Sequence, residues 1–286
     1  MTLEHLFAYD FVRNAFLAGT VVAVTAGIVG YFVVLRGLSF AGHALSHVGF
    51  AGAAGAVALG LPAVFGLMGF ALLGALGMGA LGERARGRDV AIGIVLSWSL
   101  GLGVLFLSLY KGYATEAYAL LFGQILGIST LNVAVTVLAS AVALAGVAVL
   151  YRPLLFASID PESAQARGVP VRGVAIGFML VLAVAVATAA QIVGVLLVFA
   201  LLVTPAAIAG RISARPPVAI AISIALALAF TWGGLLAAFC APFPVSFFIT
   251  TFAFVAYVVA RTLRPGTVNR SGAAHRLDSI MRIHYR

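Results

Sequence analysis

The sequence predicts an all-α membrane protein, a bundle of about eight or nine transmembrane helices. Of its 286 residues, 63% are hydrophobic and 9% are charged, whereas about a quarter of the residues of a soluble domain are charged. The mean hydropathy is +1.17, and apolar stretches long enough to cross a bilayer follow one another along the chain. Together these features exclude a water-soluble enzyme, a nucleic-acid reader and a disordered regulator.

The apolar stretches divide the chain into a transmembrane domain, residues 1–261, and a basic tail, residues 262–286. A helix of about 20 residues spans the hydrocarbon core. The segment 117–129 is apolar but short, so we expect a re-entrant or interfacial helix there. The predicted spans are 14–35, 39–60, 62–82, 90–109, 131–150, 173–190, 192–210, 217–239 and 245–261.

The basic residues predict the orientation of these spans. The chain has 17 Lys and Arg residues and a formal net charge of +9. With nine spans, all of the basic residues except Arg13 and Lys111 fall on one side of the membrane. Because Lys and Arg accumulate on the cytoplasmic side, the N-terminus is expected outside and the C-terminus inside. The excess of positive charge therefore indicates orientation in a lipid bilayer rather than a nucleic-acid partner.

The polar segment 151–172 contains the signals of a short helix between two spans. Asp160 is a favourable N-cap, and Pro161 suits the first helical position. Glu162 and Arg167 complement the two ends of the helix dipole, and Gly168 suits the left-handed residue that ends a helix. We expect about two turns of amphipathic helix on the cytoplasmic side.

This helix has two interpretations. It is either a linker on the membrane surface or a docking element for a cytoplasmic partner. In the second case its polar side chains would seat in a groove of the partner; they are Asp160, Glu162, Gln165 and Arg167.

Two histidines stand in an otherwise apolar span. His43 and His47 are four residues apart, which places both imidazoles on one face of a helix. Polar side chains inside a membrane are costly and commonly functional, and neutral imidazole binds zinc and other first-row metals. The pair could supply two ligands, with the others from another segment, water or a second copy of the chain. The alternative is that both rings are hydrogen-bonded to carbonyls of neighbouring helices.

Other chemistry is missing from the sequence. Lys111 is the single lysine and no phosphate-binding loop motif is present, so an ATP-driven function would need an ATPase on another polypeptide. Cys240 is the single cysteine, which excludes an intrachain disulfide and a cysteine metal cluster.

Five segments, in order, resemble the integral membrane subunits of bacterial ABC importers for zinc, manganese and iron. The resemblance covers about residues 14–260. The segments are Ser39–His47, Asp89–Ser97, Leu121–Gly127, Ile159–Gly168 and Gln191–Ala209, the last with Pro205 inside a helix.

The resemblance implies a permease with a type II ABC-importer fold in the cell membrane, a transport subunit rather than an enzyme. It implies a homodimer above two cytoplasmic ATPase subunits and below an extracytoplasmic metal-binding protein. Residues 160–168 would be the coupling helix, Pro205 a structural kink, and His43 and His47 contacts of the passing ion. No permanently bound cofactor is implied; the metal is the cargo.

One departure from the family concerns the metal. His43 stands where the family commonly has Asp, and replacing a carboxylate by an imidazole favours zinc weakly over manganese. Two other transporters remain as alternatives: an ABC permease for a metal chelate such as a siderophore or cobalamin, and an ion-gradient-driven secondary transporter. A membrane anchor or assembly factor would leave the histidine pair unexplained.

Overall fold

The computed structural model describes residues 9–81, 85–109, 123 and 125–263, and the regular structure in these residues is helical, as predicted. The helices are α2 (Asp10–Leu35), α3 (Ser39–Ala58), α4 (Ala63–Leu81), α5 (Ala85–Leu109), the 3-10 turn η1 (Ile125–Gly127), α7 (Thr130–Ile159), α8 (Pro161–Ala166), α9 (Val171–Val193), α10 (Val195–Ile212), α11 (Pro216–Cys240) and α12 (Val245–Leu263).

The described residues contain nine helices of 18 residues or more, one for each predicted span. Seven of these are long and apolar enough to cross a membrane, and α3 and α10 are not among the seven. The spans predicted at 39–60 and 192–210 are nevertheless helices, α3 and α10, and the number of long helices in the described residues agrees with the prediction of about eight or nine. In α3, two histidines and four glycines lower the mean hydropathy of the helix.

The predicted span 131–150 was too short, because α7 continues through Pro153 to Ile159. Proline removes one helical hydrogen bond, but Leu154 and Ala157 in the continuation are buried against the bundle. Of the predicted interfacial segment 117–129, most lies outside the described residues. Its described part contains η1, and Ser129 caps α7 by accepting a hydrogen bond from the Asn132 amide.

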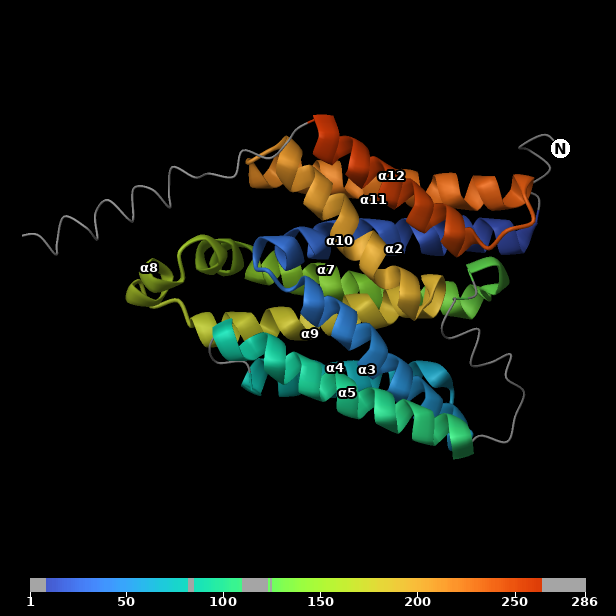
Figure 1. The fold of residues 1–286 in the computed structure, drawn as a ribbon, viewed down its shortest axis with the longest axis horizontal. Helices are drawn as coiled ribbons and strands as arrows, with labels where there is room; N and C mark the ends of the chain where they lie inside the picture. The colour runs from blue at the N-terminus through green and yellow to red at the C-terminus, as the bar shows by residue number, and fades with distance from the viewer. Residues whose placement is uncertain (1–8, 82–84, 110–122, 124, 264–286) are drawn as a thin grey trace, which may run out of the picture.

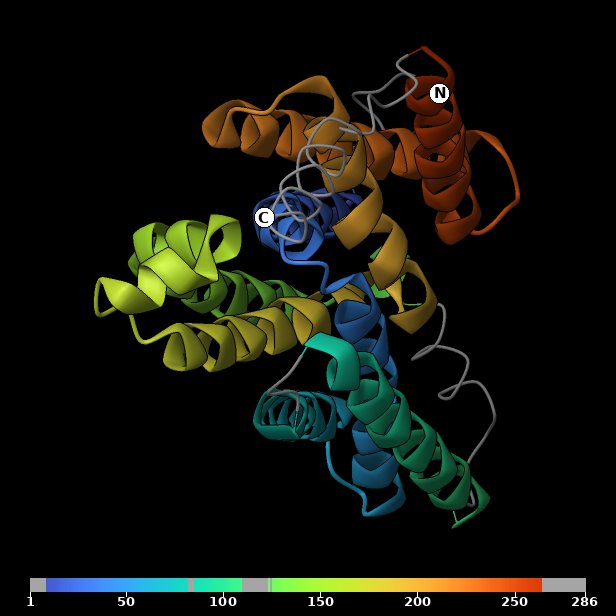
Figure 2. The same cartoon turned by 60° about the vertical axis from the view of Figure 1, so that its left-hand side comes forward.

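The bundle has three parts (Figure 1). Helices α2, α7 and α9 form the middle, α3, α4 and α5 lie on one side, and α11 and α12 lie on the other. Figure 2 shows α10 crossing between the middle and the α12 side. In α2 and α9, 67% of the most apolar stretch is buried, against 17% in α5 and α12. The central helices therefore make the core, and the outer ones present apolar surface to lipid.

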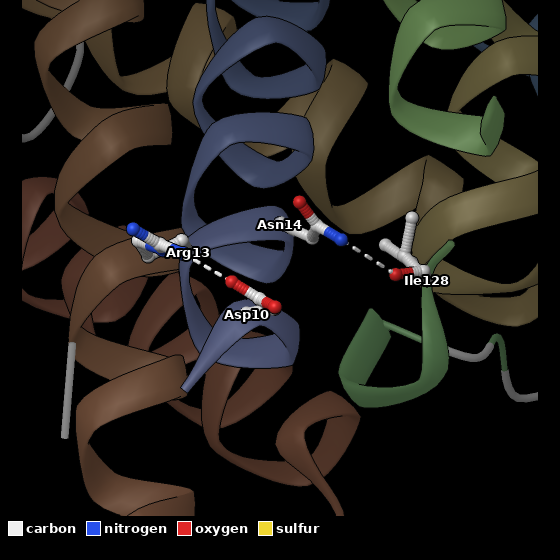
Figure 3. A network of polar contacts seen from close by, with 4 residues as sticks. All are labelled: Asp10, Arg13, Asn14 and Ile128. Carbon is white, nitrogen blue, oxygen red and sulfur yellow. Dashed lines mark hydrogen bonds and ion pairs between the residues drawn. The ribbon is translucent and has the colours of Figure 1, made fainter. Parts of the chain in front are cut away.

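The two ends of the bundle differ in charge. At the end containing η1, the Asn14 side-chain amide donates a hydrogen bond to the Ile128 carbonyl over 3.1 Å, and Arg13 pairs with Asp10 (Figure 3). At the end containing α8, Arg36 donates a hydrogen bond to the Ser158 hydroxyl over 3.2 Å. Further arginines at helix ends on this α8 side are Arg152, Arg167, Arg172, Arg211, Arg215 and Arg261. This grouping matches the one-sided distribution that the sequence predicts.

Helices α9 and α10 are joined by a single residue at the η1 end. Gly194 has φ 88° and ψ 152°, a conformation essentially reserved for glycine. Gly123 lies directly against this turn, because a Cβ added to it would overlap the main chain of Val193 and Gly194. The path of α10 is thus set by a sharp turn that a neighbouring segment braces.

Candidate metal-ion site

The two histidines are the partly exposed residues of a helix that is otherwise mostly buried. Every residue of α3 from Ala41 to Ala56 is buried except His43 and His47, which are half-buried. Their ring centroids lie 4.7 Å apart, with the ring planes at 81°. The predicted placement on one helix face, one turn apart, is what the structure has.

The remaining positions of α3 are buried because four helices surround it. Helices α4, α5, α9 and α10 all pack on α3. Small residues allow the closest approach: a Cβ added to Gly52 would overlap the carbonyl oxygen of Gly66 in α4. With its other faces filled, α3 leaves only the side bearing the imidazoles open.

The imidazoles are available as ligands. Within the described residues, no hydrogen bond joins either ring to a neighbouring carbonyl, and no ring nitrogen is both buried and unpartnered. The alternative of two rings satisfied by neighbouring helices is therefore not what this part of the chain contains. Imidazole nitrogens that reach the surface can donate a lone pair to a divalent cation.

The described part of one chain supplies only this pair. Its residues contain no group of three or more His, Cys, Asp or Glu side chains that could hold a metal. Two ligands leave at least two coordination positions to be filled from elsewhere. The arrangement suits weak, temporary contact with an ion better than permanent retention.

Sequence reasoning missed one neighbour of the pair. Phe199 of α10 contacts the His43 ring, with centroids 5.6 Å apart and planes at 81°. Nothing in the apolar run around Phe199 distinguishes it from its neighbours, and only the crossing of α10 over α3 brings the two rings together.

Pro205 lies inside α10, as the resemblance implies, and it is buried. Proline has no amide hydrogen, so it cannot donate the helical hydrogen bond to Leu201. The role of Pro205 as a kink stays a prediction.

The second candidate element, α8, has the predicted local structure. The Asp160 carboxylate accepts a hydrogen bond from the Ser163 amide over 3.0 Å, and Pro161 occupies the first helical position. Hydrogen bonds from Ser163 hold the pKa of the Asp160 carboxyl below its ordinary value. Gly168 ends the helix with φ 82°, and Val169 donates its amide to the Ala164 carbonyl over 3.0 Å.

Almost all of α8 is exposed. Ala164 is fully buried and anchors the helix, and the Arg167 guanidinium lies 5.6 Å from the centroid of the Phe156 ring. Glu162 and Gln165 are exposed, and the helix that carries them, α8, lies at one end of the bundle (Figure 1). Since α8 connects α7 to α9, and α9 packs on α3, a displacement of α8 has a short route to the histidine helix.

Comparison with known proteins gives a family. The sequence profile of the ABC 3 transport family matches residues 8–264. The chain is 34% identical over 208 residues to the manganese transport system membrane protein MntC of Listeria innocua, covering 72% of this chain and 74% of that protein. It is also 34% identical over 208 residues to the manganese import system permease protein ScaB of Streptococcus gordonii, with the same coverage.

Solved structures agree with the fold. The chain superposes on PsaBC from Streptococcus pneumoniae, solved in complex with Fab, with a TM-score of 0.81 and 30% identity, covering 91% of this chain and 94% of that one. An inward-facing structure of a putative metal-chelate type ABC transporter gives a TM-score of 0.67 at 15% identity, covering 87% and 85% of the two chains. At that identity the likeness extends to the fold alone.

Proposed function

The chain belongs to the ABC 3 transport family, as a permease of a metal-ion ABC transporter, and from this premise we propose that it imports manganese or a related divalent first-row ion. The observation that carries the proposal is the pair of accessible imidazoles, His43 and His47, on an otherwise buried helix. In transit the ion makes temporary contacts with both rings, held weakly enough to be released.

The names of the relatives bear on the metal. MntC and ScaB are both named for manganese, and they lend the expected preference for zinc no support. Imidazole is a ligand for several divalent ions of the first row, so a histidine at position 43 is compatible with manganese, iron or zinc. Uptake measured with each of the three ions in turn decides among them.

A second copy of the chain would complete the ion path. One chain offers two imidazoles on a half-buried face, and most protein oligomers are symmetric dimers in which the same surface meets itself. A two-fold arrangement would bring four imidazoles to one path, enough ligands to replace part of the hydration shell of the ion. Neither copy alone would hold the ion firmly.

Energy for transport would come from a separate ATPase. In this proposal the exposed polar face of α8, with Glu162 and Gln165, seats in a groove of the ATPase at the cytoplasmic side. Closure of the ATPase on ATP displaces α8 and, through α9, the helices around the ion path. The arginine-rich α8 side is then cytoplasmic, and an extracytoplasmic binding protein delivers the ion at the η1 side.

The test is ATP-dependent metal uptake by proteoliposomes that contain the permease, its ATPase and the metal-loaded binding protein. We expect His47→Ala, and separately His43→Ala, to lower the uptake of Mn²⁺ at least about tenfold, because each removes one of two ligands. Co-purification with the ATPase should be unchanged. Leu138→Ala, at an exposed position of α7, is the matched control and should transport normally.

Normal Mn²⁺, Fe²⁺ and Zn²⁺ uptake by both histidine variants would refute the proposed ion contact. Uptake that needs no ATPase and follows an ion gradient would instead indicate a secondary transporter.

A further inference from the structure

The ring of Phe199 lies beside the candidate ion ligand His43. Phe199 belongs to the first half of α10, and its side chain is 39% exposed. Its centroid is 5.6 Å from that of His43, within the range of favourable edge-to-face aromatic contact.

The His43 imidazole therefore has two aromatic neighbours, His47 and Phe199. The planes of Phe199 and of His47 each make an angle of 81° with the plane of the His43 imidazole. Rotation of His43 about its Cβ–Cγ bond would change the angle between the imidazole and both neighbouring rings and would lose the favourable perpendicular geometry. The two near-perpendicular contacts thus favour one orientation of the ring and of its nitrogens.

The backbone that carries Phe199 is itself fixed. Phe199 is five residues beyond Gly194, the sharp turn between α9 and α10, and Gly123 lies so close to that turn that an added Cβ would overlap its main chain. Further along α10, a Cβ added to Gly30 of α2 would overlap the carbonyl oxygen of Leu202. Contacts on both sides of Phe199 along α10 leave its ring little freedom to retreat.

A metal ligand needs such restraint, because the lone pair of an imidazole lies in the ring plane and must point at the ion. In stable metal sites a carboxylate or carbonyl bonded to the second ring nitrogen supplies the restraint. No such partner of His43 exists in the described residues. We infer that Phe199 is a positioning residue, whose ring holds the His43 imidazole in the orientation that a passing divalent cation contacts.

The inference rests on the proposed ion contact of His43, and its test separates the two. The purified permease–ATPase complex is titrated with Mn²⁺, and free Mn²⁺ is followed by electron paramagnetic resonance to give Kd. Uptake by proteoliposomes is measured in parallel. The variants are Phe199→Leu, which removes the ring but keeps most of the volume, and Phe199→Tyr, which keeps the ring. Phe254→Leu, at an exposed position of α12, is the control.

We expect Phe199→Leu to raise Kd for Mn²⁺ by about threefold to tenfold, the value of one edge-to-face contact, and to slow uptake in proportion. Phe199→Tyr and Phe254→Leu should stay within about twofold of the unmodified protein. A merely structural role is excluded by repeating Phe199→Leu in a His43→Asp background. A carboxylate does not stack on a ring, so Kd and uptake should then be indifferent to Phe199→Leu.

The inference would be overturned if Phe199→Leu left the Kd for Mn²⁺ and the uptake rate unchanged while His43→Ala weakened Mn²⁺ binding and uptake. The proposed function would then still stand. An equal loss in the His43→Asp background would overturn the inference as well, because it would reveal a general packing defect. If His43→Ala and His47→Ala both bind and transport Mn²⁺ normally, the proposed ion contact fails, and the inference fails with it.

Discussion

Replacing Gly52 by alanine tests whether close contact between α3 and α4 holds the histidine helix in place. A Cβ at position 52 would lie 2.6 Å from Cγ of Phe70 and would overlap the Gly66 carbonyl oxygen. Ordinary contact between carbon atoms requires about 3.5–4.0 Å, so the two helices must separate by about 1 Å. Neither the backbone of Gly66 nor the Cβ and Cγ atoms of Phe70 can move away by a simple side-chain rotation. Overpacking of this kind costs about 1–3 kcal/mol.

The apparent Tm of the purified permease–ATPase complex measures the effect. A destabilisation of 1 kcal/mol lowers Tm by about 2–4 °C in domains of about 150–250 residues, so a cost of about 1–3 kcal/mol in Gly52→Ala should lower Tm by about 2–12 °C. Displacement of α3 should also slow metal uptake. The matched control is Gly69→Ala in α4, where no atom lies within 4 Å of the added Cβ; it should leave Tm unchanged or slightly higher. Equal Tm values for the two variants would refute this account of the packing.

The remaining predictions concern α8. Replacing Glu162 and Gln165 together by alanine should abolish the stimulation of ATP hydrolysis by the metal-loaded binding protein, because both side chains are exposed on the proposed docking face; an unchanged ATPase rate would refute the docking role. Asp160→Ala should weaken the same stimulation by removing the N-cap, whereas Asp160→Asn should keep it. Hydrogen bonds from Ser163 lower the pKa of Asp160, so the charged cap persists above the ordinary carboxyl pKa and is lost only as pH falls through the lowered value. Stimulation should therefore be constant between about pH 6 and 8, and a marked decline within that interval would contradict the assignment.

Much of the architecture could be predicted because each signal was local. The hydrophobic stretches gave the nine long helices, and the residues from Asp160 to Gly168 carry in themselves the cap, the first-turn proline and the terminating glycine of α8. The i, i+4 spacing of His43 and His47 places them on one face by helix geometry alone. The grouping of arginines on the α8 side follows from alternation of the spans.

What could not be predicted depends on contacts between distant segments. The continuation of α7 past Pro153 is stabilised by burial of Leu154, which hydropathy alone does not reveal. Likewise the contact of Phe199 with His43 exists only because α10 turns sharply at Gly194 and crosses α3. The sequence around a phenylalanine in an apolar stretch does not show which residue its ring contacts. The sequence around Gly194 likewise does not show the direction that α10 takes after the turn.

The single-residue turn at Gly194 also limits how α9 and α10 can move. A longer loop could change its conformation when two helices slide past each other. A single linking residue cannot, because neighbouring Cα atoms stay about 3.8 Å apart. A displacement of α9 along its axis, starting at the end next to α8, must therefore displace the first turn of α10 by a similar distance. The two helices therefore move together, and residues inserted after Gly194 would allow them to move independently.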